Sequence, residues 1–202
     1  SYEKARESLN KFLELQPGDK DALRLLNNAD FALSMENDPP PLHTFSNEAM
    51  LNSSYSDYGA KYFKEQIIFT SSRMDESGSN KTYEVDGQGF SNLYSTTYDN
   101  ADKTWSKAKK MDALSSNFND GVFSYSPKTK TAYIGQCSGE KGSLCRIMHS
   151  TYNINTESWS SPEPIEYEGK EIEMVHPSIS KDGKRLYFVS RQVEESEGGS
   201  DI

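Results

Sequence analysis

The chain has 202 residues, enough for one large or two small domains. Its formal net charge of -9 disfavours binding to nucleic acid and to anionic membrane surfaces. No apolar run approaches the ~20 residues that a membrane-spanning helix needs, so direct membrane insertion is not expected. Both ends fall within patterned sequence, which predicts a piece of a longer protein.

Residues 1–36 are predicted to form two helices. Apolar side chains recur every three or four positions in residues 2–13, the period of an amphipathic helix. Pro17 and Gly18 end that segment, and a following aspartate can cap a second helix. The apolar face of the second helix is made of Ala22, Leu23, Leu25, Leu26, Ala29 and Leu33. Residues 37–46, with three consecutive prolines, are expected to be a stiff linker.

The helical segment resembles a tetratricopeptide repeat. Its matching positions are Tyr2-Glu3-Lys4-Ala5, Phe12, Leu15-Gln16-Pro17, Leu23 and Leu26. Asn27 stands where the repeat has a small residue, and Asp30 where it has an aromatic one. These departures predict the terminal cap of a helical array. A plain helical hairpin is the alternative.

Residues 47–202 contain an internal repeat. From Thr44 onward the apolar period changes from 3.6 to 2, which indicates strands. Leu93 begins a strand-like segment that matches the one at Ile147, and Trp105 matches Trp159, each pair lying 54 positions apart. The constant spacing predicts two copies of one strand–turn–strand unit.

A second strand motif occurs three times, at residues 66–71, 131–136 and 185–190. A hairpin turn at Asp182-Gly183 precedes the third copy. Each unit reads as four short strands in about 55 to 65 residues, the spacing of a propeller blade. We therefore expect an α+β, mainly β chain, in which a helical hairpin precedes the first two to two and a half four-stranded antiparallel blades of a β-propeller. The structural residues that define the repeat are predicted to be Phe69, Trp105, Trp159, Asp182, Gly183 and Phe188.

Residues 177–188, followed by Gly198-Gly199-Ser200-Asp201-Ile202, resemble a TolB-type, WD-like propeller repeat. Helical repeats that run into such a propeller resemble the PorE-like family of Bacteroidetes envelope proteins, associated with the type IX secretion system. This resemblance implies a periplasmic scaffold associated with the outer membrane, whose partners are other envelope or secretion-system proteins. In that family peptidoglycan is bound only through a downstream OmpA-like domain, which is absent from this sequence.

No catalytic, cofactor-binding or metal-ligating residues are predicted. The three histidines lie far apart, without the spacing of metal ligands: His43, His149 and His176. No nucleophile elbow or phosphate loop is found. Three aspartates stand at predicted turns in successive units, a repetition that favours a structural role: Asp57, Asp120 and Asp182.

Cys137 and Cys145 fall at the ends of two strands predicted to be hairpin neighbours. A disulfide between them is geometrically reasonable, and the oxidising periplasm that the resemblance implies favours it. Two free thiols are the alternative. Because Trp105 and Trp159 occupy equivalent positions, packing between strands is favoured over exposed binding platforms for both.

The predicted function is therefore protein recognition by a scaffold that is not an enzyme. One rival is a carbohydrate-binding propeller that uses the two tryptophans as sugar platforms. The other is a hydrolase-associated propeller, which needs paired carboxylates or a catalytic domain further along the chain. The blade interpretation requires that Trp105 and Trp159 lie in similar surroundings.

Overall fold

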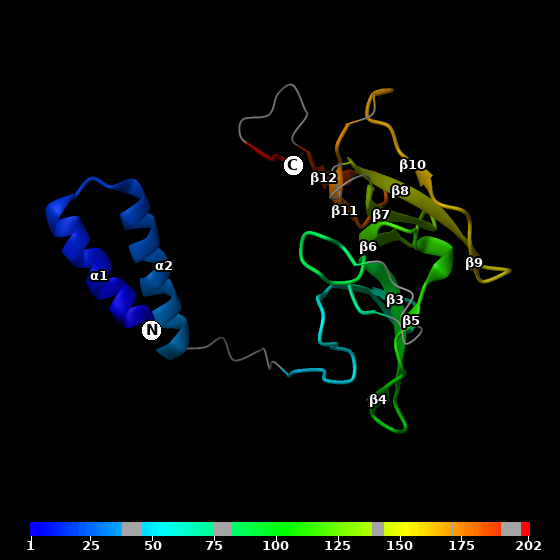
Figure 1. The fold of residues 1–202 in the computed structure, drawn as a ribbon, viewed down its shortest axis with the longest axis horizontal. Coiled ribbons are helices and arrows are strands. Elements are labelled where there is room, and N and C mark those ends of the chain that lie inside the picture. The colour runs from blue at the N-terminus through cyan, green and yellow to red at the C-terminus, as the bar shows by residue number, and fades with distance from the viewer. Residues whose placement is uncertain (38–45, 75–81, 139–143, 171, 191–198) are drawn as a thin grey trace. The chain divides into compact units, whose positions relative to one another are not determined.

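The computed structural model describes residues 1–37, 46–74, 82–138, 144–170, 172–190 and 199–202 (Figure 1). Two compact units result, Ser1–Ser46 and Asn47–Ile202. Most of the predicted linker, with His43, lies outside the described residues. In the described part of the chain, no helix has the length and apolar character needed to cross a membrane.

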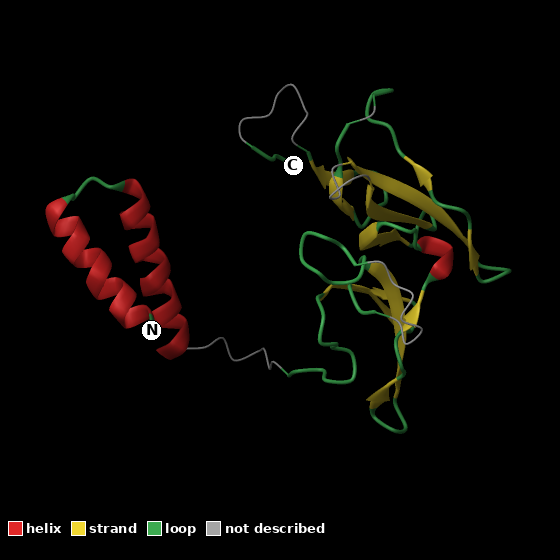
Figure 2. Ribbon diagram, viewed as in Figure 1, coloured by secondary structure: helices red, strands yellow, loops and turns green. Residues whose placement is uncertain are grey.

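The first unit is a hairpin of two helices, α1 (Tyr2–Leu15) and α2 (Lys20–Asn37) (Figure 2). The Asp19 carboxylate accepts a hydrogen bond from the Ala22 backbone N–H at 2.8 Å, the geometry of a helix N-cap. α1 buries none of its side chains, and α2 contributes the buried apolar residues Ala22, Ala29 and Leu33. The hairpin therefore has a small core of its own.

The described residues of the second unit form three antiparallel sheets. The strands of the first sheet are β1 (Asp57–Phe63), β2 (Gln66–Ser71), β3 (Asn92–Asp99), β4 (Thr104–Trp105) and β5 (Lys109–Lys110). The strands of the second are β6 (Asn119–Ser126), β7 (Thr131–Ser138), β8 (Leu144–Asn153), β9 (Ser158–Trp159) and β10 (Glu163–Pro164). The third contains β11 (Val175–Ile179) and β12 (Leu186–Val189), and a 3-10 turn, η1 (Asp112–Leu114), lies between the first two.

The 54-residue repeat is visible in the pairing of the strands. Tyr98 pairs with Trp105 in the first sheet, and Tyr152 pairs with Trp159 in the second. The turns between these strands also match, because Lys103 and Glu157 both adopt a left-handed backbone, with φ of 52° and 51°. The repeat is thus a structural duplication that extends to the turn conformation.

The fold predicted from the sequence, a tetratricopeptide hairpin followed by propeller blades, is wrong. The described residues form one two-helix hairpin and three open antiparallel sheets, which do not close into a propeller and do not continue a helical array. The TolB-like and WD-like assignments fall with it. Strand–turn–strand repeats and an Asp-Gly turn specify only local structure. Any duplicated antiparallel sheet can contain them. Closure into a ring depends on contacts between distant segments that such motifs do not encode.

The two tryptophans, moreover, lie in unlike surroundings. Trp159 packs among the rings of Phe63, Phe123, Tyr125 and Tyr152, with centroid distances of 5.1, 6.0, 5.9 and 4.8 Å. Trp105 contacts the ring of Tyr98 at 4.9 Å. The two tryptophans therefore pack differently, although they occupy equivalent sequence positions. The blade interpretation requires similar surroundings for both and is contradicted on this point.

The buried core of this unit joins the first sheet to the second. Its members are Phe63, Ile68, Leu93, Leu114, Phe123, Ala132, Ile134 and Tyr152. Phe63 ends β1, and its ring meets those of Tyr125 and Tyr152 edge-on at 4.9 and 5.1 Å. The next residue, Lys64, donates hydrogen bonds to the Tyr152 hydroxyl at 2.8 Å and the Glu157 carboxylate at 3.1 Å. These contacts of Phe63 and Lys64 hold the β1–β2 turn against the second sheet.

Cys137 on β7 and Cys145 on β8 are paired directly across the strands and form a disulfide bond, with a Cα–Cα distance of 4.0 Å. The bond closes a short loop, because the two residues are 8 positions apart.

We expect the Cys137→Ala/Cys145→Ala double variant to unfold with a free energy about 2 to 3 kcal/mol lower than wild type. The loss comes from the added conformational freedom of the unfolded chain when the cross-link is absent. Urea denaturation under oxidising conditions measures the difference, and reductant should remove it by weakening the wild type alone. Equal midpoints without reductant would contradict a stabilising role.

Candidate binding site

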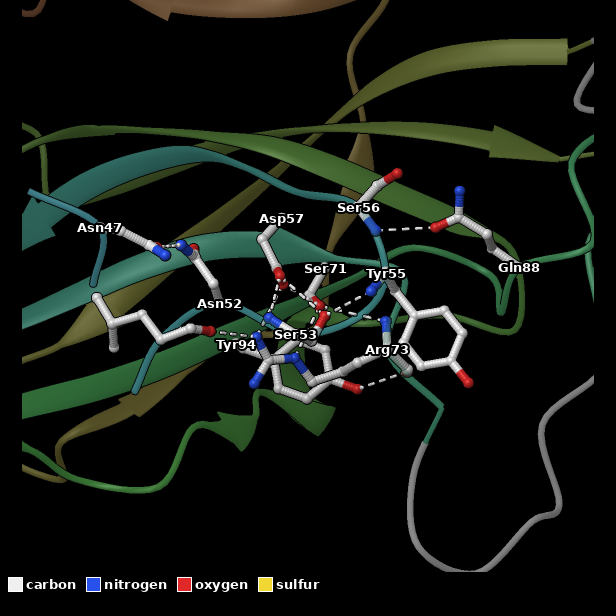
Figure 3. Close-up of polar contacts among 11 residues, drawn as sticks. Asn47, Asn52, Ser53, Tyr55, Ser56, Asp57, Ser71, Arg73, Gln88 and Tyr94 are labelled. Atoms are coloured by element: carbon white, nitrogen blue, oxygen red, sulfur yellow. Dashed lines mark hydrogen bonds and ion pairs between the residues drawn. The ribbon is translucent and has the colours of Figure 1, made fainter. Parts of the chain in front are cut away.

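A Ser-x-aromatic-x-Asp motif occurs at the start of both large sheets, a repeat that the sequence analysis missed. It comprises Ser53 to Asp57 and Ser116 to Asp120. The Asp57 carboxylate accepts hydrogen bonds from the Ser53 backbone N–H at 2.6 Å and its hydroxyl at 2.8 Å (Figure 3). Asp120 accepts the same two bonds from Ser116, at 2.5 and 2.9 Å. Each aspartate thus closes the turn that leads into the first strand of its sheet.

Asp57 also pairs with Arg73 at 2.8 Å, and both side chains are largely buried, at 10% and 19% exposed. The Ser71 hydroxyl donates a further bond to Asp57 at 2.6 Å. Burial raises the pKa of Asp57, but the hydrogen bonds from Arg73, Ser71 and Ser53 outweigh this effect and lower it overall. The carboxylate is therefore held ionised within the fold.

Arg73 is itself fixed from several directions. Its guanidinium donates to the Leu51 carbonyl at 2.6 Å and lies 5.1 Å from the ring centroids of both Phe69 and Tyr94. Figure 3 shows Tyr94 beside Arg73. Stacking on aromatic faces adds to the ion pair and excludes water from it. The Asp57–Arg73 pair therefore links β1, β2 and β3 through its contacts with Ser71, Phe69 and Tyr94. We call this group of five residues the Arg73 clamp.

Asp120 has the equivalent serine partner, Ser116, but among the described residues no arginine forms an ion pair with it. Its carboxylate is fully buried, and the Gln136 side chain donates to it at 3.0 Å. Burial raises the pKa of Asp120, and the hydrogen bonds from Ser116 and Gln136 do not offset that effect. Two aspartates from one repeated motif thus have pKa values shifted in opposite directions.

A small pocket adjoins Asp120, with a cavity volume of about 100 Å³. Its lining comes from the first strands of all three sheets, from β7, and from Ser91, just before β3: Tyr58, Ser91, Asn119, Asp120, Gly121, Val122, Gly135, Cys137, Val175 and His176. His176 is exposed and has a left-handed backbone with φ of 55°. Asp120, His176 and Tyr58 are among the lining residues, but the Asp120 side chain is fully buried and already hydrogen-bonded to Ser116 and Gln136. No group of three or more metal-ligating side chains occurs within the described residues.

The structure brings only some of the residues singled out in the sequence together. Asp120, Cys137 and His176 share the pocket, whereas Phe69 belongs to the Arg73 clamp. His149 lies apart, with Nε2 3.9 Å from the Glu163 carboxylate. Phe188 is half-buried and meets the ring of Tyr167 at 5.9 Å.

Asp182 and Gly183 form a hairpin turn away from both aspartate motifs. The Asp182 carboxylate accepts bonds from the Ser180 hydroxyl at 2.6 Å and the Lys184 backbone N–H at 3.1 Å, which lower its pKa. Gly183 has φ of 72°, where a side chain would be strained. The three predicted turn aspartates are therefore not equivalent.

No protein-family model matches the chain, and no curated protein matches it significantly. Among solved structures, that of a luciferin-regenerating enzyme is similar over 68% of this chain and 40% of that chain, with 20% sequence identity and a TM-score of 0.41. The chain thus spans less than half the length of that protein.

Proposed function

We propose that this chain is a non-enzymatic protein-interaction module, and that its helical hairpin carries the contact with the partner. The supporting observation is the apolar surface of that hairpin. Leu15 is 83% exposed, Phe31 66% and Tyr2 51%. Exposed large apolar side chains on so small a unit mark a surface that another protein covers.

The energetics of the hairpin support the same proposal. Its buried apolar residues are two alanines and one leucine, so it gains little from burial, at roughly 25 cal/mol per Å² of apolar surface. The ion pair between Arg6 and Asp30 spans 3.8 Å with both side chains about half exposed, so it adds little. Packing against a partner would supply the missing apolar contacts.

The proposed setting is the periplasmic side of the outer membrane, with another envelope protein as partner. The Cys137–Cys145 bond supports an oxidising compartment, where disulfides persist. In its narrower form the proposal places the chain in a type IX secretion assembly, as a PorE-like protein.

The aspartate motifs support recognition without chemistry. Asp57 is saturated by hydrogen bonds and by Arg73, so its charge stabilises the fold. Trp159 packs inside the ring cluster, which leaves the carbohydrate-platform alternative without its second tryptophan.

We expect a Leu15→Glu/Phe31→Glu variant to lose its partner. The two new carboxylates would have to be buried, or left unpaired, in an interface that the wild type fills with apolar side chains. Wild type and variant are compared by affinity capture from an envelope extract of the native organism, followed by quantitative mass spectrometry. The partner should be an envelope protein whose recovery falls at least tenfold.

The matched control is Gln16→Glu/Asn28→Glu, which adds the same charge at neighbouring exposed positions, the C-cap of α1 and the interior of α2. It should capture as much partner as the wild type does. Equal capture by all three proteins would contradict the helical contact, and capture of no envelope protein by the wild type would contradict the proposed function.

A further inference from the structure

The first sheet inserts a turn into an aromatic face of the second sheet. That face is made of three rings: Tyr125, Tyr152 and Trp159. The Phe63 ring lies on it, with centroid distances of 4.9, 5.1 and 5.1 Å to those three rings. The next residue, Lys64, begins the β1–β2 turn and pairs with the Glu157 carboxylate at 3.1 Å. The second sheet therefore binds a turn in which an aromatic residue is followed by a cation.

The first sheet has an equivalent face, made of Tyr62, Tyr98 and Trp105, which we call the exposed aromatic face. Tyr62 and Thr96 both pair with Ile67, so these three side chains point to one side of the sheet. Tyr98 lies two residues after Thr96, on the same side, and pairs with Trp105. Among the described residues, no ring of another sheet contacts this face.

The exposure of these side chains differs between the two sheets. Tyr62 is 81% exposed, whereas its counterpart Tyr125 is half-buried. Tyr98 is 38% exposed, whereas its counterpart Tyr152 is 5% exposed. The first sheet therefore leaves in solvent an aromatic surface that the second sheet buries under Phe63. A patch of this kind marks a contact with another molecule.

The charge beside the exposed aromatic face is inverted. Lys103 stands at the position that Glu157 has in the second sheet, and both residues have a left-handed backbone, with φ of 52° and 51°. Glu157 pairs with Lys64, whereas Lys103 is exposed and forms no ion pair with any described residue. Lys103 would repel a second cation. The turn that fits the first sheet therefore has an acidic residue after its aromatic residue.

A turn with this chemistry occurs in the described part of the same chain. Tyr167 and Lys170 exchange backbone hydrogen bonds of 3.2 and 2.9 Å around a two-residue turn that begins with Glu168. Glu168 is left-handed, with φ of 51°, as Lys64 is at the same place in its own turn, with φ of 53°. Glu168 is exposed, and Tyr167 is 36% exposed despite its contact with Phe188. The segment between β10 and β11, which contains this turn, projects beyond the strands (Figure 1).

We propose that the exposed aromatic face of one copy of the chain binds the Tyr167-Glu168 turn of a second copy. The Tyr167 ring takes the place that Phe63 has on the second sheet, and the Glu168 carboxylate pairs with Lys103. The Tyr98 hydroxyl can donate a hydrogen bond to the same carboxylate. The contact joins two different surfaces, so the copies associate head to tail. Both surfaces belong to the sheet unit, so the inference does not depend on the helical contact proposed above.

The test is self-association of the intact chain, measured by sedimentation velocity over a series of protein concentrations. We expect the average mass of the wild type to rise with concentration. Lys103→Glu and Glu168→Lys should each weaken association at least tenfold, because like charges then meet. The double variant Lys103→Glu/Glu168→Lys should regain the wild-type association, because the ion pair forms again with its charges exchanged. The matched control is Glu166→Lys, an exposed position two residues before the turn, which should associate as the wild type does.

Any of three results overturns the proposal. The first is a wild type that keeps the mass of one chain at every concentration. The second is association that neither single variant weakens, as self-association through the helices would give. The third is a double variant that associates no better than the single variants. The Leu15→Glu/Phe31→Glu variant should associate as the wild type does, and Glu168→Lys should still capture the envelope partner, so the two proposals can fail separately.

Discussion

Replacing Phe63 with alanine should lower the free energy of unfolding of the sheet unit by about 3 to 5 kcal/mol. Phe63 is 5% exposed, and its ring contacts four aromatic rings of the second sheet: Phe123, Tyr125, Tyr152 and Trp159. Truncation removes these contacts and leaves a cavity between two sheets whose rigid strands cannot collapse to fill it. Urea denaturation followed by circular dichroism measures the loss.

The neighbouring residue provides a matched control. Tyr62 lies on the same strand and is 81% exposed, so Tyr62→Ala should change the unfolding free energy by less than about 1 kcal/mol. Trp159 fluorescence gives a second measurement, since Phe63→Ala removes the ring 5.1 Å from that indole and should shift its emission to longer wavelength. Similar losses for both variants would contradict the junction that Phe63 forms between the sheets.

Replacing Asp57 with asparagine should cost about 2 to 3 kcal/mol at neutral pH, because the largely buried Arg73 loses its counter-charge. Both carboxylate oxygens of Asp57 face backbone or guanidinium N–H donors, from Ser53 and from Arg73. An asparagine amide group would therefore meet an N–H donor in either orientation. Urea denaturation at pH 7 measures the loss.

Asp120 is the matched control within the same motif. Its asparagine variant can keep every contact: the amide oxygen accepts from the Ser116 N–H, and the NH₂ donates to the Ser116 hydroxyl and to a flipped Gln136. We expect Asp120→Asn to be at least as stable as wild type at pH 7, because it removes the unfavourable burial that raises the pKa of Asp120. Equal losses for the two asparagine variants would contradict the different roles of the two carboxylates.

The pH dependence separates the two sites further. The lowered pKa of Asp57 means that its stabilising contribution is present above the ordinary aspartate pKa of about 3.9 and is lost as pH falls below it. The raised pKa of Asp120 has the opposite effect, because its ionisation destabilises the fold at neutral pH and the penalty fades as pH falls. The advantage of Asp120→Asn over wild type should therefore be largest near pH 7 and shrink toward pH 4.

The sequence predicted the local elements well where a single segment carries the signal. The helical periodicity matches α1 and α2, and the hairpin turn predicted at Asp182 and Gly183 is present, with Gly183 at positive φ. The repeat of Trp105 and Trp159 matches equivalent strand pairs. It could also have revealed the Ser-x-aromatic-x-Asp motif, since both copies are complete in the sequence.

The sequence by itself determined the periodicities, the turns and the duplication, because these follow from backbone preferences and side-chain alternation within short segments. Only the tertiary structure decided that the sheets remain open, that Trp159 enters the core while Trp105 does not, and that Arg73 lies against Asp57. Each of these depends on which sheet packs beside a given strand. Two copies of one motif acquire different surroundings when a second sheet packs against only one of them. The resulting burial then decides how the side chains of that copy pack and whether their charges are stabilised.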